Sequence, residues 1–502
     1  MANPLFDRLL AGAPGAVAIE TDARRFSYAD LERETARMAN ALAAVGVAPG
    51  DRVAACVEKS AANLIVYLAT IRAGGVYLPL NPAYTASELA YFIADAAPAL
   101  IVCDPAAAKA VVAIAGGRRA ETLDADGQGS LAELAARRTD AFATVARRPE
   151  DLAAICYTSG TTGRSKGAML SHGALVANAL TLKALWRFTP GDRLIHALPL
   201  YHVHGLFVAS HVALMAGGAV ILQPRFDASA VLAAMPGATC LMGVPTFYTR
   251  LLAHPGLSRE AAAAMRLFIS GSAPLSASTH QAWRERTGHA ILERYGLTET
   301  GMNASNPYDG ERIAGTVGPA LPDVALRIAD PASGRTLPRG QIGGVEVKGP
   351  NVFRGYWQAP EKTAQAFRPD GFFITGDLGV VDERGYLSIV GREKDLIITG
   401  GLNVYPKEVE EAIDGLPRVV ESAVIGLEHA DLGEAVTAIV AVGPGPAPAE
   451  GDLLAAVKPG LAGYKQPKRA VFVEALPRNA MGKVQKAELR RRFAGLYDAG
   501  RS

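Results

Sequence analysis

The chain has 502 residues, of which 49% are hydrophobic and 20% charged, a composition typical of globular proteins and far from that of disordered ones. Lys and Arg number 51 and Asp and Glu number 49, so the net charge is only +2. This balance argues against a dedicated nucleic-acid-binding protein. At roughly 150 residues per domain the length suggests about three domains or subdomains.

The N-terminal segment predicts neither a secretory leader nor a membrane anchor, because MANPLFDRLLAG contains Asp7 and no apolar core. The longest apolar stretch, 205–222, contains His211 and a Gly217-Gly218 break, which favours a core helix, a turn and a strand over a membrane span. The four cysteines form no C-x-x-C pair, as expected for reduced, buried thiols. We therefore expect a cytoplasmic protein without membrane contact.

Up to about residue 314 the sequence predicts two α/β blocks. Ser27 is expected to cap a helix whose apolar face recurs every three to four residues. Short apolar runs at 52–57, 75–80 and 99–104 alternate with helical patterns, and the same alternation returns after residue 190. Such alternation is typical of βαβ units around mainly parallel sheets.

The remaining third predicts a β-rich subdomain and a small C-terminal domain. Short β-type runs separated by turns extend from about 315 to 393 and indicate a small β-barrel or antiparallel sheet. Helical patterns then return, so residues 394–502 are expected to form a mobile α+β domain that follows an N-terminal domain of residues 1–393. From Gly463 to Ser502 the chain carries ten basic and three acidic residues. This excess of basic residues suggests a partner rich in phosphate, although a solvated basic tail would have the same composition.

The segment 157–167, YTSGTTGRSKG, combines Ser/Thr hydroxyls, glycines and a lysine within eleven residues. Glycines let backbone N–H groups approach an anion closely, and hydroxyls and a lysine can bind phosphate oxygens. It is not a Walker A loop, because Lys166 precedes Gly167 instead of Ser or Thr. Strand-like runs flank it on both sides, so it is expected to join two strands. The candidate ATP-binding residues here are Thr158, Ser159, Gly160, Thr161, Thr162, Gly163 and Lys166.

This loop resembles the phosphate-binding loop of the adenylate-forming acyl-CoA synthetase superfamily. Further segments that resemble the superfamily's motifs follow in the same order along nearly the whole chain: SGSAPL at 270–275, YGLTET at 295–300, TGD at 375–377, GR at 391–392 and PRNAMGK at 477–483. The resemblance implies that ATP or AMP is bound by Gly271, Ser272, Ala273, Tyr295, Gly296, Thr298, Asp377 and Arg392, in addition to the loop.

The same resemblance implies a two-step reaction with CoA as co-substrate. Lys483, Thr298 and Glu299 are the implied catalytic residues, and Glu299 is the implied ligand of the Mg²⁺ that accompanies ATP. The C-terminal domain is expected to rotate about Lys394 between the two steps, which brings Gly400, Gly401 and Leu402 to CoA. The context of Lys483 also resembles sites modified by a lysine acetyltransferase, which would be a partner of this protein.

The residues are also consistent with this chemistry when considered on their own. A thiol cannot displace oxide from a carboxylate, but it can displace AMP from an acyl-adenylate. Forming that adenylate brings an anionic carboxylate to the anionic α-phosphate, so cationic and hydrogen-bonding groups are required. A non-catalytic nucleotide-binding protein would be expected to lack Lys483 or Glu299, and both are present.

Within the superfamily the sequence looks closest to malonyl-CoA synthetases, on the segments 200–205, 243–250 and 301–308. This predicts malonate or methylmalonate as the acid. Arg250 is the expected partner of the second carboxylate, on a helix capped by Thr246, because arginine binds carboxylates in bidentate fashion. His204 and Ser270 are weaker candidates for the same site. The alternative is a ligase for a medium-chain or aryl acid.

Overall fold

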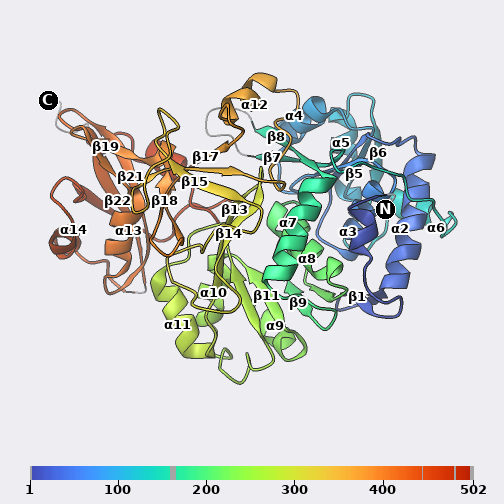
Figure 1. The fold of residues 1–502 in the computed structure, drawn as a ribbon, viewed down its shortest axis with the longest axis horizontal. Helices are drawn as coiled ribbons and strands as arrows, with labels where there is room; N and C mark the ends of the chain where they lie inside the picture. The colour runs from blue at the N-terminus through green and yellow to red at the C-terminus, as the bar shows by residue number, and fades with distance from the viewer. Residues whose placement is uncertain (1–2, 159–164, 444, 480–481, 498–502) are drawn as a thin grey trace.

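The structure is a computed structural model that describes residues 3–158, 165–443, 445–479 and 482–497. Figure 1 shows the N-terminal α/β blocks at one end and the C-terminal domain at the other, with the small β-rich part between them. In the described part of the chain, no helix is both long enough and apolar enough to cross a membrane.

The first α/β block is built on a sheet with the strand order β6-β5-β3-β4-β7-β8, in which only β7 and β8 pair antiparallel. Its strands are β3 (Arg52–Cys56), β4 (Val76–Pro79), β5 (Leu100–Cys103), β6 (Arg119–Thr122), β7 (Leu152–Thr158) and β8 (Lys166–Ser171). The early helices are α1 (Phe6–Leu9), α2 (Tyr28–Ala44), α3 (Ala61–Arg72), α4 (Ala86–Ala96), α5 (Ala108–Ile114) and α6 (Ser130–Ala136). Ser27 caps α2 as predicted, in a reciprocal box with Asp30.

The second block has the strand order β14-β13-β12-β11-β9-β10-β1-β2 and is parallel except at its two ends. Its strands are β1 (Val17–Glu20), β2 (Arg25–Ser27), β9 (Arg193–His196), β10 (Ala219–Leu222), β11 (Cys240–Gly243), β12 (Leu267–Ser270), β13 (Leu292–Leu297) and β14 (Gly301–Ser305). Its helices are α7 (His172–Leu185), η2 (His204–Ala209), α8 (Ser210–Met215), α9 (Ala228–Ala234), α10 (Pro245–Leu252) and α11 (Ala277–Thr287). The prediction of two mainly parallel α/β blocks is confirmed.

The apolar stretch 205–222 also folds as predicted. It forms the π-helical turn η2, then α8, then a turn at Gly217 with φ of 75°, and finally the buried strand β10. The positive φ explains why a glycine stands at this turn. All four cysteines are buried and free, in agreement with the prediction of reduced thiols.

The β-rich part is an antiparallel sheet of β15 (Ala325–Ala329), β16 (Gly343–Lys348), β17 (Phe373–Val381) and β18 (Leu387–Arg392). Within the described residues its edge strands β15 and β18 do not pair with each other, so the sheet is open. Of the two forms expected from the sequence, the antiparallel sheet is therefore the one observed. Helix α12 (Pro360–Ala366) precedes β17.

The C-terminal domain is a mixed sheet with helices on both faces. Its strands are β19 (Ile397–Thr399), β20 (Leu402–Val404), β21 (Val419–His429), β22 (Gly433–Val442) and β23 (Arg469–Val473). Apolar residues of α13 (Pro406–Asp414) and α14 (Glu450–Val457) pack on one face, and those of α15 (Lys486–Arg492) pack on the other. The predicted α+β C-terminal domain is confirmed, and Lys407 anchors it to the N-terminal domain by donating to the carbonyl of Ile389 at 3.0 Å.

Candidate active site

The predicted motifs converge where parallel strands of the second block end. Strands β12 and β13 lie side by side with Ser270 opposite Glu293. Their carboxyl ends therefore bring the segments 270–273 and 295–300 together, as expected for ligand sites in α/β sheets. Strand β14 turns back antiparallel to β13, and the glycine at position 296 is required there because a Cβ would lie 1.9 Å from the carbonyl oxygen of Gly301.

Asp377 forms the centre of a buried polar group with Tyr295 and Arg392. The Tyr295 hydroxyl donates to Asp377 Oδ2 at 2.5 Å, and Arg392 Nε lies 2.5 Å from Asp377 Oδ1. Asp377 is buried, which raises its pKa, while the charge of Arg392 and the hydrogen bond from Tyr295 oppose this rise. The three residues predicted to bind the nucleoside are thus assembled by two different sheets.

Glu299 and Lys166 both contact Tyr356, which makes these three residues a second polar cluster of the site. The Tyr356 hydroxyl donates to Glu299 Oε1 at 3.0 Å, and Lys166 Nζ lies 4.7 Å from the centre of the Tyr356 ring. Thr158 pairs with Lys166 across β7 and β8, so the predicted strands on either side of the phosphate loop are confirmed. The loop residues Ser159, Gly160, Thr161, Thr162 and Gly163 lie outside the described residues.

Glu299 is a single carboxylate, and one of its oxygens already accepts a hydrogen bond from Tyr356. Such a site suits Mg²⁺ better than a metal that requires a full set of protein ligands. Magnesium keeps several waters and is commonly held by one or two carboxylates together with substrate phosphates. Glu299 is nearly buried, and Thr298 beside it is half-buried. The donor set is therefore suited to a magnesium ion that arrives with ATP.

Lys483 belongs to the C-terminal domain but faces the N-terminal groups. Its charge interacts with Asp377, Glu299, Arg392 and Arg294. Lys483 retains solvent exposure, but desolvation by the surrounding protein, followed by the charge of Arg392, lowers its pKa. In this arrangement the C-terminal domain delivers its lysine to the groups around Asp377 and Glu299.

The loop that carries Lys483 meets the start of α10. A Cβ on Gly482 would lie 3.4 Å from Thr246 Oγ1, and Arg478 interacts electrostatically with Arg250. Of this loop, residues 480 and 481 lie outside the described part of the chain.

Arg294 on β13 is a functional candidate that the sequence reasoning missed. It is 3% exposed, and its Nε and Nη2 have no hydrogen-bond partner among the described residues. Its guanidinium packs on Gly271, where a Cβ would lie 2.4 Å from Cζ. Burial lowers the pKa of Arg294 to about 9. A buried guanidinium without a partner is costly unless a ligand completes it.

The residues that sense the charge of Arg294 show that it faces His202, His204 and Lys483. Its charge depresses the pKa values of His202, His204 and Lys483, in addition to the effect of burial on each. His204 is buried, with Nδ1 3.2 Å from Ser272 Oγ and Nε2 without a partner among the described residues. Arg294 and His204 thus offer unsatisfied nitrogens close to the lysine of the C-terminal domain.

The sequence did contain a signal for Arg294. The segment predicted as a strand, AILERYG, carries two adjacent ionisable residues, Glu293 and Arg294. In a mainly parallel sheet both faces are covered, so adjacent residues that point to opposite faces must both be buried. Two buried charges in one strand indicate a functional site more strongly than a single arginine on a helix.

Two predictions about α10 need correction. Arg250 is exposed, so it does not supply the buried guanidinium that was predicted for a second carboxylate. Its helix is only eight residues long and turns this position to the surface, while Phe247 and Leu251 face the core. Thr246 is not the cap either, because Pro245 already begins the helix and Val244 is its N-cap.

The other predicted residues have different surroundings. Ser270 is buried, and its hydroxyl has no partner in the part of the chain that the structure describes. The strand register pairs it with Glu293, so the structure does not group it with Arg294. Lys394 lies in the short turn η4 (Glu393–Asp395) between the last strand of the small sheet and the first strand of the C-terminal sheet. Gly400 and Gly401 form the β19–β20 turn with φ of 56° and 79°, followed by the exposed Leu402.

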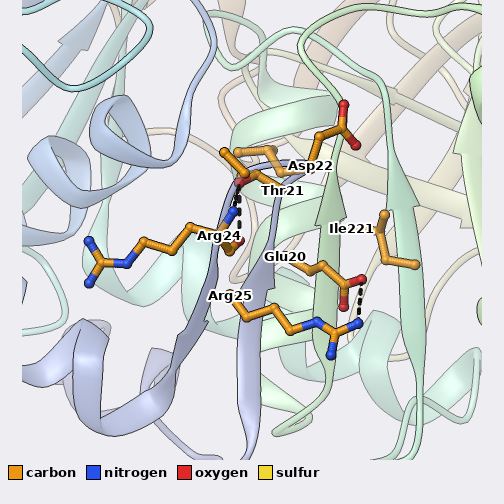
Figure 2. Close-up of a pocket in the computed structure, with 8 residues that line it drawn as sticks. Glu20, Thr21, Asp22, Arg24, Arg25 and Ile221 are labelled. Atoms are coloured by element: carbon orange, nitrogen blue, oxygen red, sulfur yellow. Dashed lines mark hydrogen bonds and ion pairs between the residues drawn. The ribbon is translucent and has the colours of Figure 1, made fainter.

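A separate surface hollow lies beside the β1–β2 turn and is lined by Glu20, Thr21, Asp22, Arg24, Arg25 and Ile221 among others. Figure 2 shows the Glu20 carboxylate directed toward Arg25. Glu20 also binds Arg193 at 2.8 Å, so its charge is neutralised by protein. None of the predicted site residues lines this hollow.

Comparison with known proteins decides the family. A model described as AMP-binding enzyme matches residues 6–357, and a model described as AMP-binding enzyme C-terminal domain matches residues 408–483. The chain belongs to the AMP-binding enzyme family. The assignment made from the ordered motifs is therefore confirmed, and the second match contains Lys483.

Solved and curated relatives extend this AMP-binding family assignment. The ATP-bound crystal structure of MatB from Rhodopseudomonas palustris is 59% identical with a TM-score of 0.97, and covers 99% of this chain and 100% of that chain. The apo structure of the same MatB has a TM-score of 0.86 at 59% identity and the same coverage. Feruloyl-CoA synthase of Amycolatopsis sp is 38% identical over 96% of both chains. Malonate–CoA ligase of Arabidopsis thaliana is 34% identical over 95% of this chain and 86% of its own length.

Proposed function

We propose that this AMP-binding enzyme is an ATP-dependent ligase that joins malonate or methylmalonate to CoA through an acyl-adenylate, releasing AMP and pyrophosphate. The observation that carries the proposal is Arg294, a buried guanidinium with unpartnered nitrogens beside His204 and Lys483. A second carboxylate on the acid is the chemical group that completes it, because carboxylate and guanidinium pair in bidentate geometry. The likeness to malonate–CoA ligase supports the same substrate.

The alternative is a medium-chain or aryl acid, and the likeness to feruloyl-CoA synthase favours an aryl acid within that class. An apolar tail beside Arg294 would leave a buried charge without a partner, which is unfavourable. The charge and burial of Arg294 therefore favour a short dicarboxylate over either alternative.

In the first step an oxygen of the reacting carboxylate bonds to the α-phosphorus of ATP, and the bond to pyrophosphate breaks. We assign the nucleoside to Asp377, Arg392 and Tyr295, because a carboxylate can accept hydrogen bonds from ribose hydroxyls and an aromatic ring can pack on adenine. We assign to Thr298 a hydrogen bond to the α-phosphate. The remaining contacts are assigned to the loop from Thr158 to Lys166 and to the segment Gly271, Ser272, Ala273 and Gly296.

Glu299 would hold Mg²⁺, which neutralises phosphate charge and orients the pyrophosphate group when it is bound. Lys483 adds a positive charge beside the oxygen atoms that repel one another as the carboxylate approaches the phosphate. The higher TM-score with ATP-bound MatB than with apo MatB supports the view that the two domains are arranged for this first step.

In the second step the CoA sulfur bonds to the acyl carbon, the bond from that carbon to the AMP oxygen breaks, and the thiol proton is released. We propose that the domain of residues 394–502 first rotates about Lys394, so that Lys483 leaves the site. The Gly400–Leu402 turn, whose Leu402 is 49% exposed in this structure, would then reach CoA. Acetylation of Lys483 by a lysine acetyltransferase would remove its charge and stop the first step. We further propose a cytoplasmic location.

ATP–pyrophosphate exchange with acetate, malonate, methylmalonate, succinate, octanoate and ferulate tests the substrate. We expect kcat/KM for malonate to exceed that for acetate by at least about 30-fold, since acetate leaves Arg294 unpaired at a cost of roughly 2 kcal/mol or more. A preference for octanoate or ferulate would show that the dicarboxylate proposal is wrong. Exchange without later CoA-dependent release of AMP would show that the ligase proposal is wrong.

A further inference from the structure

Lys59 is a buried lysine with no acidic partner among the residues that the structure describes. It follows β3 in the first α/β block, is 9% exposed, and is not joined in any ion pair among the described residues. Its Nζ lies 3.0 Å from Nδ1 of His196 and donates to the backbone oxygen of His196 at 2.7 Å. His196 is fully buried at the end of β9 in the second block. Lys59 therefore spans the junction of the two blocks and binds a single residue.

The partners of His196 define which of its ring nitrogens carries the proton. The carbonyl oxygen of Gly205 can only accept, and it lies 2.9 Å from Nε2 of His196, so the proton is assigned to Nε2. Nδ1 is then the acceptor for Lys59, whose own pKa is lowered well below its ordinary value by burial. Burial and the charge of Lys59 lower the pKa of His196 to about 3, consistent with a neutral ring. The contact with Lys59 thus fits the tautomer of His196 that donates to Gly205.

The Gly205 carbonyl lies in the π-helical turn η2 and accepts from two elements. Ser210 donates to it through its backbone N–H and through its hydroxyl at 3.0 Å, and His196 adds a third donor. Gly205 cannot carry a side chain, because a Cβ would lie 2.1 Å from the carbonyl oxygen of Pro199. Single π-turns within helices are frequently found at functional sites. The peptide between Gly205 and Leu206 is therefore fixed by His196 and Ser210.

His204 immediately precedes Gly205, and it is the residue whose Nε2 has no partner among the described residues, beside Arg294. Its Nδ1 lies 3.2 Å from the Ser272 hydroxyl. When Nδ1 accepts a hydrogen bond from that hydroxyl, Nε2 carries the proton and can donate to a ligand. Since His204 is bonded directly to Gly205, a shift of the anchored Gly205 carbonyl would also displace the His204 ring. We propose that Lys59 and His196 are positioning residues that hold the π-turn so that His204 stays directed at the second carboxylate of the acid. This inference rests on the proposed dicarboxylate substrate.

The first test is Lys59→Met in the full-length enzyme, which removes the ammonium while keeping an unbranched side chain. We expect kcat/KM for malonate to fall by about 10- to 100-fold, mainly through KM, because small misplacements near a reacting substrate cost up to about 100-fold. The KM for ATP and the activity with acetate should change less than threefold, roughly the scatter of neutral substitutions. Tyr28→Phe removes buried hydrogen bonds to the carbonyls of Leu214 on α8 and of Gly218 but leaves the contacts of Lys59 and His196 in place, so it is the matched control and should leave all values unchanged.

A second test compares two substitutions of His196. His196→Gln places an amide donor near the position of Nε2 and should retain more malonate preference than His196→Leu. Equal loss in both variants would overturn the role of the Gly205 hydrogen bond. This comparison also covers the case in which Lys59→Met fails to fold.

The wild-type enzyme itself provides a third readout. Long-range ¹H–¹⁵N spectra of histidine-labelled protein, with His196 assigned by its loss in His196→Gln, should show the Nε2-protonated tautomer. The Nδ1-protonated tautomer would overturn the Lys59 contact independently of any substrate. A wild type without malonate preference would overturn the proposed function itself. A malonate-selective wild type whose preference survives Lys59→Met would overturn only this inference.

Discussion

Replacing Arg294 tests the proposal that this residue binds the second carboxylate of the acid. Arg294→Met keeps an unbranched side chain in the same space but removes the charge and the unpartnered nitrogens. Truncating one partner of a buried charge pair costs roughly 2–5 kcal/mol, or about 30-fold to several thousand-fold in kcat/KM. We expect a loss of this size with malonate and little change with acetate, as measured by ATP–pyrophosphate exchange.

Stability should change in the opposite direction. Burial lowers the pKa of Arg294 to about 9, so burying the charged form is unfavourable, at about 1.4 kcal/mol per unit of pKa. Removing that charge should therefore raise the Tm of the ligand-free enzyme. Malonate should raise the Tm of the wild type by binding to it, and it should not raise the Tm of the variant.

Arg250→Leu is the matched control, because it removes an arginine that is exposed on α10. We expect this variant to keep the malonate-to-acetate ratio of the wild type. If Arg294→Met kept that ratio and Arg250→Leu lost it, the assignment of Arg294 would be refuted and the exposed arginine would be the selector. Arg294→Lys should be intermediate, since it keeps the charge but loses bidentate pairing.

Three further predictions concern the two half-reactions and pH. Lys483→Ala should lower adenylation by at least about 100-fold while converting supplied malonyl-AMP and CoA at nearly the wild-type rate; equal loss in both assays would show a shared or structural role. Lys394→Pro should retain adenylation but lose thioester formation, because proline fixes φ at the proposed pivot, and an unchanged overall rate would place the pivot elsewhere. Burial raises the pKa of Glu293 from 4.5 to about 8, so the folded protein holds this proton more tightly than the unfolded chain. The stabilisation is complete below about pH 4.5 and falls by up to about 1.4 kcal/mol per pH unit until about pH 8. The Tm of Glu293→Gln relative to wild type should therefore rise from pH 5 to pH 8, and a constant difference would contradict the shift.

Local patterns in the sequence determined most of the architecture and the ATP end of the site. Ser27, the strands around the phosphate loop and the helix–turn–strand path of 205–222 follow from capping, periodicity and glycine positions, which depend on near neighbours in the chain. The nucleotide residues were found because each stands in a short ordered motif. The structure then brought Tyr295, Asp377 and Arg392 together from two sheets.

Only the tertiary structure decided which groups face the acid. Arg250 stands in a predicted amphipathic helix and Arg294 beside Glu293 in a predicted strand, and the sequence alone does not establish which arginine faces the acid. That depends on the helix face of α10, which is exposed, and on the sheet around β13, which is covered on both sides. The contact of Lys59 with His196 joins residues 137 positions apart, a loop after β3 in the first block and the end of β9 in the second. Desolvation is a property of the assembled layers, so a local pattern such as the adjacent Glu293 and Arg294 can indicate a buried charge but not the groups that surround it.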